Sequence, residues 1–175
     1  MPAAFLRKNI RLPRRAYLGC TICFATLCFD QRRNFALDPA FATWLIDFLR
    51  SHAAREFFLI HAYCVMPDHL HFLSEGTYPS ADTRAFANHF KQLTGYAFTQ
   101  RRNLRLRQPM WCDHLVRPNE SIEAVCWYIW TNPVRRKLCL RPVDYPFLGS
   151  FSDCGSRICS TAPDFTWQPP WKVPA

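Results

Sequence analysis

His69 and His71 are separated by one apolar residue, Leu70, and follow directly after Pro67 and Asp68. Side chains of a β-strand alternate between its two faces, so both imidazoles would project from one face while Leu70 enters the core. Two neutral imidazoles side by side suit a divalent metal. The spacing alone is weak evidence, because single histidines usually serve as satisfied core or surface groups.

Tyr128 and Asn132 form a second candidate pair, in the run Tyr-Ile-Trp-Thr-Asn-Pro-Val-Arg at 128–135. Residues four apart on a continuing helix share a face, so a phenol and an amide oxygen could reach one site. Two structural readings stay open. Asn132 before Pro133 is a good helix cap, and Tyr128 taken alone is a half-buried packing residue. Capping and metal ligation do not exclude one another.

Alternating and helical apolar patterns predict the elements that position these residues. Asp38 and Asp82 are expected to cap the first two helices, and Asn119 or Ser121 a third, whose inner face includes Ile122, Val125 and Ile129. Pro67 and Asp68 supply turn chemistry between two strands. We expect strands over 17–29, 57–66 and 69–75, with a fourth around 110–116.

The order β-α-β-β-α-β with an added helix is typical of an α+β, ferredoxin-like (split βαβ) fold, in which helices pack mainly on one face of an antiparallel sheet. The other face would then be available for a ligand. We expect residues 1–150 to form one domain and 151–175 a Pro-rich C-terminal tail, in which Trp167 and Trp171 dock back on the domain.

Charge points to a polyanionic partner. The 175 residues include 22 Lys and Arg against 13 Asp and Glu, a net charge of +9. Nucleic acid is the leading candidate, and the alternative is a solvated basic face.

No apolar run before Tyr17 is long enough for a signal peptide or membrane span, so we expect a cytoplasmic protein without a membrane partner. The nine cysteines fit reduced thiols better than a disulfide framework. Cys20 and Cys23 form a CxxC, but positions three apart in a strand point to opposite faces, which disfavours a zinc site there.

Met-Pro-Asp-His-Leu-His at 66–71, together with the run at 128–135, resembles the single-tyrosine HUH transposases, especially their REP-associated branch. Trp111 with Asp113-His114-Leu-Val-Arg117, and Tyr145-Pro-Phe-Leu-Gly-Ser150, extend the resemblance over roughly residues 11–150. One departure is Arg136-Lys137, where the family often has a small residue followed by glycine. The turn after the helix is therefore expected to differ.

The resemblance implies an HUH nuclease fold in which His69 and His71 bind a divalent metal, Asn132 is a third ligand and Tyr128 is the nucleophile. Imidazole and oxygen ligands at a phosphate suit Mg²⁺ or Mn²⁺, although they would also accept zinc. Such a metal can hold the scissile phosphate and neutralise developing charge during attack by Tyr128. The family further implies single-stranded or hairpin DNA as the partner, a 5′-phosphotyrosine link and strand transfer at REP-like repeats.

Basic side chains are the candidates for phosphate contacts, although each could equally be a solvated charge. They are Arg14, Arg15, Lys91, Arg101, Arg102, Arg105, Arg107, Arg135 and Arg136. For Asp113 and His114 we favour structural hydrogen bonding over catalysis. The pattern does not decide between a monomer and a homodimer.

Two other functions remain as alternatives. Ferredoxin-like sheets also serve as non-catalytic nucleic-acid-binding modules. A zinc hydrolase using the His pair is disfavoured because no carboxylate lies at the spacing expected of a general base.

Overall fold

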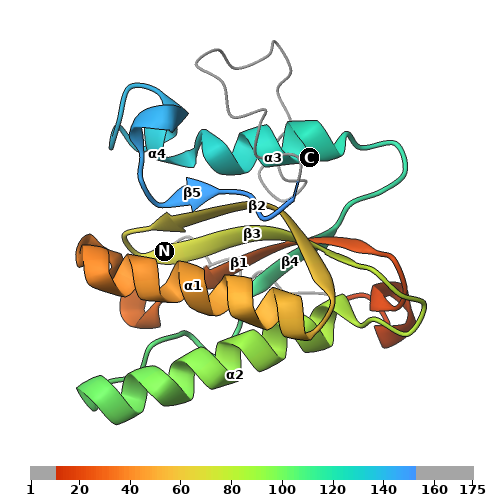
Figure 1. Ribbon diagram of the computed structural model, residues 1–175, viewed down its shortest axis with the longest axis horizontal. Coiled ribbons are helices and arrows are strands. Elements are labelled where there is room, and N and C mark those ends of the chain that lie inside the picture. The colour runs from red at the N-terminus through yellow and green to blue at the C-terminus, as the bar shows by residue number, and fades with distance from the viewer. Residues whose placement is uncertain (1–10, 153–175) are drawn as a thin grey trace, which may run out of the picture.

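The computed structural model describes residues 11–152 and has the predicted α+β fold (Figure 1). Along the chain the main elements run β-α-β-β-α-β-α-α-β. They are β1 (Ile22–Cys28), α1 (Pro39–Arg55), β2 (Phe58–Met66), β3 (His69–Gly76), α2 (Thr83–Arg102), β4 (Cys112–Leu115), α3 (Ile122–Trp130), α4 (Asn132–Arg135) and β5 (Leu148–Gly149). The first six elements are the split βαβ arrangement.

The five strands form one antiparallel sheet in the order β4-β1-β3-β2-β5. Strand β3 is central, and its first residue, His69, pairs with Cys28 of β1 and with Met66 of β2. The turn at Pro67 and Asp68 joins β2 to β3, as expected from its residues. The His pair therefore opens the middle strand of the sheet, where both neighbouring strands fix its position.

Alternation along β3 sends its side chains to two different layers. Leu70 and Phe72 join the core that α1 and α2 cover, whereas Leu73 belongs to a second cluster with Val125 and Ile129 of α3. Figure 1 shows α1 and α2 on one side of the sheet and α3 with α4 on the other. The second face is thus not wholly open, because α3 packs against part of it.

Side-chain caps begin the three long helices where the sequence indicates. The carboxylates of Asp38 and Asp82 accept hydrogen bonds from the backbone N–H groups of Ala40 and Ala85. At the third helix the cap is Ser121, whose hydroxyl accepts from Ala124. The choice left open between Asn119 and Ser121 therefore falls on Ser121, one residue before the helix.

Two boundaries differ from the predictions. The first strand begins at Ile22 rather than at residue 17, because Arg14–Tyr17 forms a 3-10 turn and Gly19 takes a positive φ of 85°. Such a backbone interrupts an extended strand and is readily adopted only by glycine. The third helix stops at Trp130, and α4 restarts at Asn132.

The expected tail lies mostly outside the described residues, and so do Trp167 and Trp171. The last described aromatic, Phe151, packs on Tyr63 with ring centroids 4.7 Å apart. Among the described helices, none combines the length and apolar character needed to cross a bilayer.

Candidate functional site

A pocket of about 350 Å³ lies on the α3 side of the sheet, at the end of β3 where the His pair stands. Strands β1 and β3 form its floor and the helices α3 and α4 its wall. Its lining includes both histidines, Tyr128 and Asn132, all predicted for one site. The remaining lining residues are Phe24, Thr26, Cys28, Arg32, Cys112 and Arg136.

The two imidazoles converge through their Nε2 atoms, which are 2.9 Å apart. The rings are nearly perpendicular, at 81°, and both side chains are buried. Each Nδ1 atom is held from behind: Asp68 Oδ1 lies 2.5 Å from His69 Nδ1, and Thr26 Oγ1 lies 2.9 Å from His71 Nδ1. Such partners fix the orientation of a histidine and leave the other nitrogen for a ligand.

The charge states of His69 and Asp68 favour metal binding. Burial lowers the pKa of His69, although the neighbouring Asp68 carboxylate opposes this effect. The hydrogen bond from His69, assisted by Arg32, holds the pKa of Asp68 well below its usual range. At neutral pH a neutral imidazole therefore donates from Nδ1 to an ionised carboxylate, and its Nε2 lone pair faces the pocket.

Asn132 contributes an oxygen to this pocket. Its amide nitrogen donates to the carbonyl oxygens of Tyr128 (3.0 Å) and Ile129 (3.3 Å), near the end of α3. The amide thus caps the end of α3, whereas no side-chain hydrogen bond caps the start of α4. Because Nδ2 makes both bonds, Oδ1 is the amide atom left to bind a ligand.

These donors fit a divalent metal. Two nitrogens about 2.1 Å from one ion and at right angles around it are about 3 Å apart, close to the observed separation of 2.9 Å. Within residues 11–152, no group of three or more His, Cys, Asp or Glu side chains is arranged to hold an ion. A third protein ligand would therefore be of another type, and Asn132 supplies an amide oxygen in the same pocket.

Tyr128 projects from α3 and is 8% exposed. Phe24 of β1 lies between it and the imidazoles: its ring stacks on His71 at 5.3 Å and meets the edge of Tyr128 at 5.9 Å. This aromatic contact fixes the distance between helix and sheet at the pocket. The position of the phenol is therefore set by packing on both sides of the gap.

Arg135 packs over the ring of Tyr128. Its guanidinium carbon is 4.2 Å from the centre of the phenol ring, and its nitrogens donate to the Tyr128 carbonyl at 2.9 Å and to Thr131 Oγ1 at 2.5 Å. Burial lowers the pKa of Arg135, and interaction with Tyr128 opposes that shift. The result is a fixed cation beside the tyrosine ring.

Two more arginines stand at the mouth of the pocket. Arg32 and Arg136 both line it, and their guanidinium groups lie 3.1 Å and 3.9 Å from Asp68 Oδ2. Arg136 was predicted to contact DNA, but Arg32 and Asp68 were not among the predicted site residues. The basic run Arg32-Arg33 after β1 was the available sequence signal for Arg32. Asp68 could have been noticed as the residue preceding the His pair.

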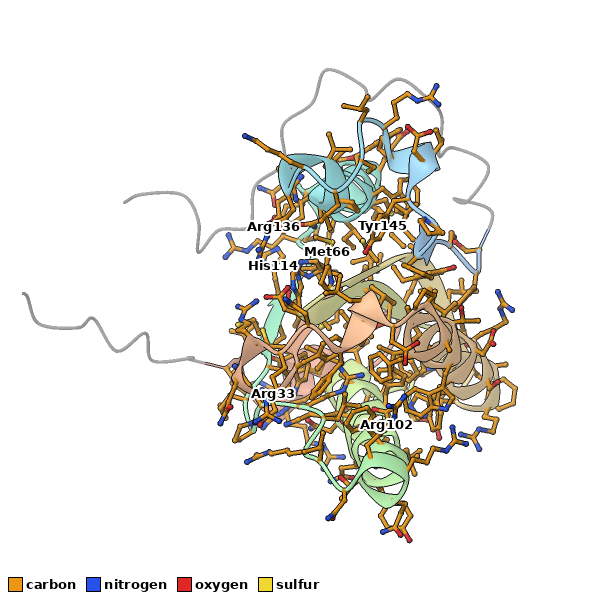
Figure 2. All side chains as sticks on the ribbon, turned by 90° about the vertical axis from the view of Figure 1, so that its left-hand side faces the viewer. Arg33, Met66, Arg102, His114, Arg136 and Tyr145 are labelled. Atoms are coloured by element: carbon orange, nitrogen blue, oxygen red, sulfur yellow. The ribbon has the colours of Figure 1, made fainter. Side chains whose placement is uncertain are left out.

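Arg135, also predicted to contact DNA, packs on Tyr128, and the remaining predicted DNA-binding residues lie away from this pocket. Figure 2 shows Arg136 on the α3–α4 side of the sheet and Arg102 with α2 on the opposite side. Arg102 pairs with Asp38, Arg101 lies over the ring of Trp44, and Arg14 pairs with Asp82. Arg15 is exposed on the N-terminal 3-10 turn. A separate pocket beside α2 is lined by Lys91, Arg105 and Arg107.

Asp113 and His114 make structural contacts, as favoured from the sequence. Asp113 accepts a hydrogen bond from the Tyr17 hydroxyl and pairs with Arg11. His114 Nε2 lies 2.8 Å from a carboxylate oxygen of Glu120. The cysteines of the CxxC are not placed to share one zinc ion. Cys23 is buried in β1, whereas Cys20 is exposed before that strand.

Comparison with known proteins points to one family. The sequence model for a family described as "Transposase IS200 like" matches residues 23–125, more than half of the chain. That match includes the His pair and ends just before Tyr128. No curated protein sequence matches significantly.

Two solved structures have similar folds. One is a REP-associated tyrosine transposase bound to a REP hairpin, with a TM-score of 0.72 and 23% identity, over 91% of this chain and 95% of that one. The other is a candidate transposase from Deinococcus radiodurans, with a TM-score of 0.50 and 19% identity, over 73% of this chain and 92% of that one. The family match and the shared fold agree: this chain belongs to the IS200-like transposase family and has the fold of a REP-associated tyrosine transposase.

Proposed function

We propose that this transposase is a metal-dependent strand transferase that cleaves and rejoins single-stranded DNA at hairpin-bearing repeats through a 5′-phosphotyrosine intermediate. The observation that carries the proposal is the placement of Tyr128 and the two converging imidazoles in one pocket. Family membership supports a DNA-processing enzyme. The hairpin bound to the structural relative supports repeat ends as the substrate.

His69, His71 and Asn132 would hold the ion, with Mg²⁺ or Mn²⁺ the natural choices at a phosphate. When bound, the metal would polarise the phosphate oxygens and neutralise charge that develops on them. Thr26 and Asp68 keep the imidazoles in the orientation that this role requires. Arg32 and Arg136 at the pocket mouth supply further positive charge for the DNA backbone.

Tyr128 would carry out the covalent step. Its phenol oxygen forms a bond to phosphorus, the bond from phosphorus to the 3′ oxygen breaks, and the 3′ oxygen leaves as a hydroxyl. The phenolic proton is lost to solvent during attack, and the leaving oxygen takes up a proton. Rejoining is the reverse, with a 3′-hydroxyl displacing the tyrosine. Each step exchanges one phosphodiester bond for another, so no separate energy source is needed.

Arg135 would act as a positioning residue for this nucleophile. Its hydrogen bonds to the Tyr128 carbonyl and Thr131 tie it to the end of α3, and its charge lies over the phenol ring. A cation there would stabilise the negative charge that develops on the phenol oxygen during attack. Such help is needed because a free tyrosine titrates near pH 10.

The alternative of a non-catalytic sheet platform for nucleic acid has less support. Base stacking on a sheet needs exposed aromatic side chains. Here α3 covers the middle of the second face, and Phe24 of β1 and Tyr128 of α3 are buried between the sheet and the helix. A pocket at the end of the strands remains, which suits one phosphate better than a row of stacked bases.

A gel assay tests the proposal. The protein is incubated with a labelled hairpin oligonucleotide that carries single-stranded flanks, with Mg²⁺ or Mn²⁺, and resolved under denaturing conditions. We expect a covalent protein–DNA species that requires the metal and disappears in Tyr128→Phe, while hairpin binding persists. An adduct that survives in Tyr128→Phe, or forms equally well in excess chelator, would contradict the assignment.

A further inference from the structure

A second pocket, of about 300 Å³, lies between α2 and the segment 105–108. It is on the α1–α2 side of the sheet, away from Tyr128. The residues that matter for its chemistry are Lys91, Gln92, Tyr96, Arg105, Arg107 and Gln108. None of the described residues that line this pocket is a carboxylate. Three cations around one cavity call for an explanation, because like charges close together repel one another.

Arg107 is the most unusual member of this group. It is 4% exposed, and in the described part of the chain its Nη1 and Nη2 atoms have no hydrogen-bond partner. The guanidinium lies 5.6 Å from the ring centre of Phe29 and 5.2 Å from that of Phe90. Burial lowers its pKa to about 9, so it remains charged at neutral pH. Both nitrogens are closed off from the surface, so the guanidinium adds positive charge beneath the pocket floor and strengthens its attraction for an anion.

Lys91 and Arg105 add charge at the rim. Lys91 donates to the carbonyl of Pro109, and Arg105 Nε donates to the carbonyl of Arg107. Arg105 also forms an ion pair with Asp30, whose Oδ1 lies 3.9 Å from Nε, so one carboxylate faces three cations. Burial lowers the pKa of Lys91, and the positive charges of Arg107, Arg11 and Arg105 lower it further. The pocket is therefore electropositive.

The remaining polar groups suit a nucleotide better than a bare anion. Tyr96 is 70% exposed at the pocket edge, although large aromatic side chains are usually buried. An exposed ring beside a cationic groove is a typical stacking surface for an unpaired base. Gln92 and Gln108 offer amide donors and acceptors that can bond to base edges.

The pocket is connected to the catalytic one through the end of β1. Arg107 forms a β-bridge with Phe29, and the Gln108 N–H donates to the carbonyl of Cys28 at 3.2 Å. Cys28 itself lines the Tyr128 pocket, as does Cys112, four residues beyond Gln108. Four extended residues span about 13 Å, so the two pockets lie within reach of one short strand of DNA.

We infer that this second pocket, lined by Lys91, Tyr96, Arg105 and Arg107, binds a phosphate and the adjoining unpaired base of the single strand that flanks the hairpin. The inference rests on the proposed function, since it takes the same DNA as the substrate. It assigns Lys91 and Arg105 to the phosphate and Tyr96 to the base. Arg107 supplies charge from beneath.

Binding assays with two probes test this inference. Fluorescence anisotropy is measured for a labelled hairpin with a single-stranded flank and for the same hairpin with a blunt end, at several salt concentrations. The variants are Tyr96→Ala and the double variant Lys91→Gln/Arg105→Gln, all at residues outside the core. Arg107 is left unchanged because its replacement could unfold the protein. Arg50→Gln/Arg55→Gln, on α1, removes the same charge elsewhere and serves as the control.

We expect Tyr96→Ala to weaken binding of the flanked hairpin about tenfold. The double variant should lower the slope of log affinity against log salt by about 1.4, that is, two single-strand phosphate charges. Neither variant should change binding of the blunt hairpin. The control variant should change the salt slope of either probe by less than the double variant changes that of the flanked hairpin. Unchanged binding of the flanked hairpin would overturn the inference. So would equal losses for both probes, which would place the contact on the duplex stem.

The covalent adduct is measured in parallel with the same oligonucleotides. Normal adduct formation without any flank-specific loss would refute the second pocket and leave the role of Tyr128 intact. A flank-specific loss of binding in a protein that forms no adduct would refute the proposed reaction and leave the pocket intact. Each of the two proposals can therefore be refuted while the other stands.

Discussion

Asp68 links the two chemical features of the pocket proposed as the active site. One of its oxygens holds His69 Nδ1, and the other lies near the guanidinium groups of Arg32 and Arg136. A single carboxylate thus orients the proposed metal ligand His69 and two cations at the mouth of the pocket. Its neighbours keep it ionised, so it can accept all of these contacts at neutral pH.

We expect Asp68→Asn to weaken Mn²⁺ binding by about 10- to 100-fold, because the imidazole of His69 loses the carboxylate that fixes its orientation. Isothermal titration with Mn²⁺ measures this directly, without DNA. Asp113→Asn is the matched control, since that carboxylate pairs with Tyr17 and Arg11 outside the pocket. Equal Mn²⁺ affinity in Asp68→Asn and wild type would rule out the orienting role.

Arg135 and Arg136 are neighbours in sequence with different expected roles. Arg135→Gln should slow adduct formation about 100-fold with little change in hairpin affinity, because it removes the cation beside Tyr128. Arg136→Gln should chiefly weaken hairpin binding, since that side chain is exposed at the pocket mouth. Single-turnover rates and anisotropy separate the two effects. A purely structural Arg135 would instead show unchanged rates once the variant is folded and bound to DNA.

At the scale of elements, the turn after α4 has a lysine where glycine is usual. Lys137 takes a φ of 57°, and the N–H groups of Lys137 and Leu138 donate to the carbonyls of Val134 and Pro133. This is the Schellman arrangement, which usually has glycine at the left-handed position. Lys137 therefore holds a backbone conformation that glycine adopts more readily.

Lys137→Gly should stabilise the protein by about 0.5–1 kcal/mol, because glycine adopts a left-handed backbone without steric cost. Urea unfolding monitored by circular dichroism measures the change. Lys137→Ala separates backbone from side-chain effects, since alanine removes the same charge but retains the Cβ. If alanine stabilised as much as glycine, relief of charge repulsion would be the cause instead.

Local chemistry explains why much of this architecture could be predicted. A capping carboxylate or hydroxyl acts on residues two or three positions away, so Asp38 and Asp82 mark the starts of their helices in sequence alone. The His pair likewise needs only strand alternation. Phe24 and Arg32 join the site through pairing of β1 with β3 and through the path of the chain after β1. Those contacts depend on register and packing, which no nearby residues specify.

At the scale of the whole molecule, charge and burial are distributed in ways that composition could not show. Arg107 was a candidate phosphate contact like any other arginine, yet it is buried between aromatic rings. Arg32 and Arg136 face one pocket, and Lys91 and Arg105 face another. The net charge of +9 therefore reflects at least two separate electropositive regions.

Global stability should depend on pH through His52. This residue is fully buried between α1 and α2, where Nε2 contacts the Phe86 carbonyl at 3.2 Å and Nδ1 has no partner among the described residues. Burial lowers its pKa below the model-peptide value of 6.5. The unfolded chain thus binds a proton more readily, and stability present above pH 6.5 is lost as pH falls toward the folded pKa.

We expect the free energy of unfolding to fall between pH 7.5 and pH 5 and to fall less in His52→Phe, which cannot be protonated and can stack on Phe86. Urea titrations at several pH values provide the comparison. If the free energy of unfolding changed with pH in the same way in wild type and His52→Phe, groups other than His52 would be responsible.

The central position of β3 has a consequence for how activity is lost. The two imidazoles belong to a strand that is hydrogen-bonded on both sides, whereas Tyr128 stands on a nine-residue helix outside the sheet. The proposed metal ligands and the proposed nucleophile are therefore held by different forces: backbone hydrogen bonds on both sides for β3, and side-chain packing for α3. Separation of α3 from the sheet would remove Tyr128 from the pocket and leave the His pair in place.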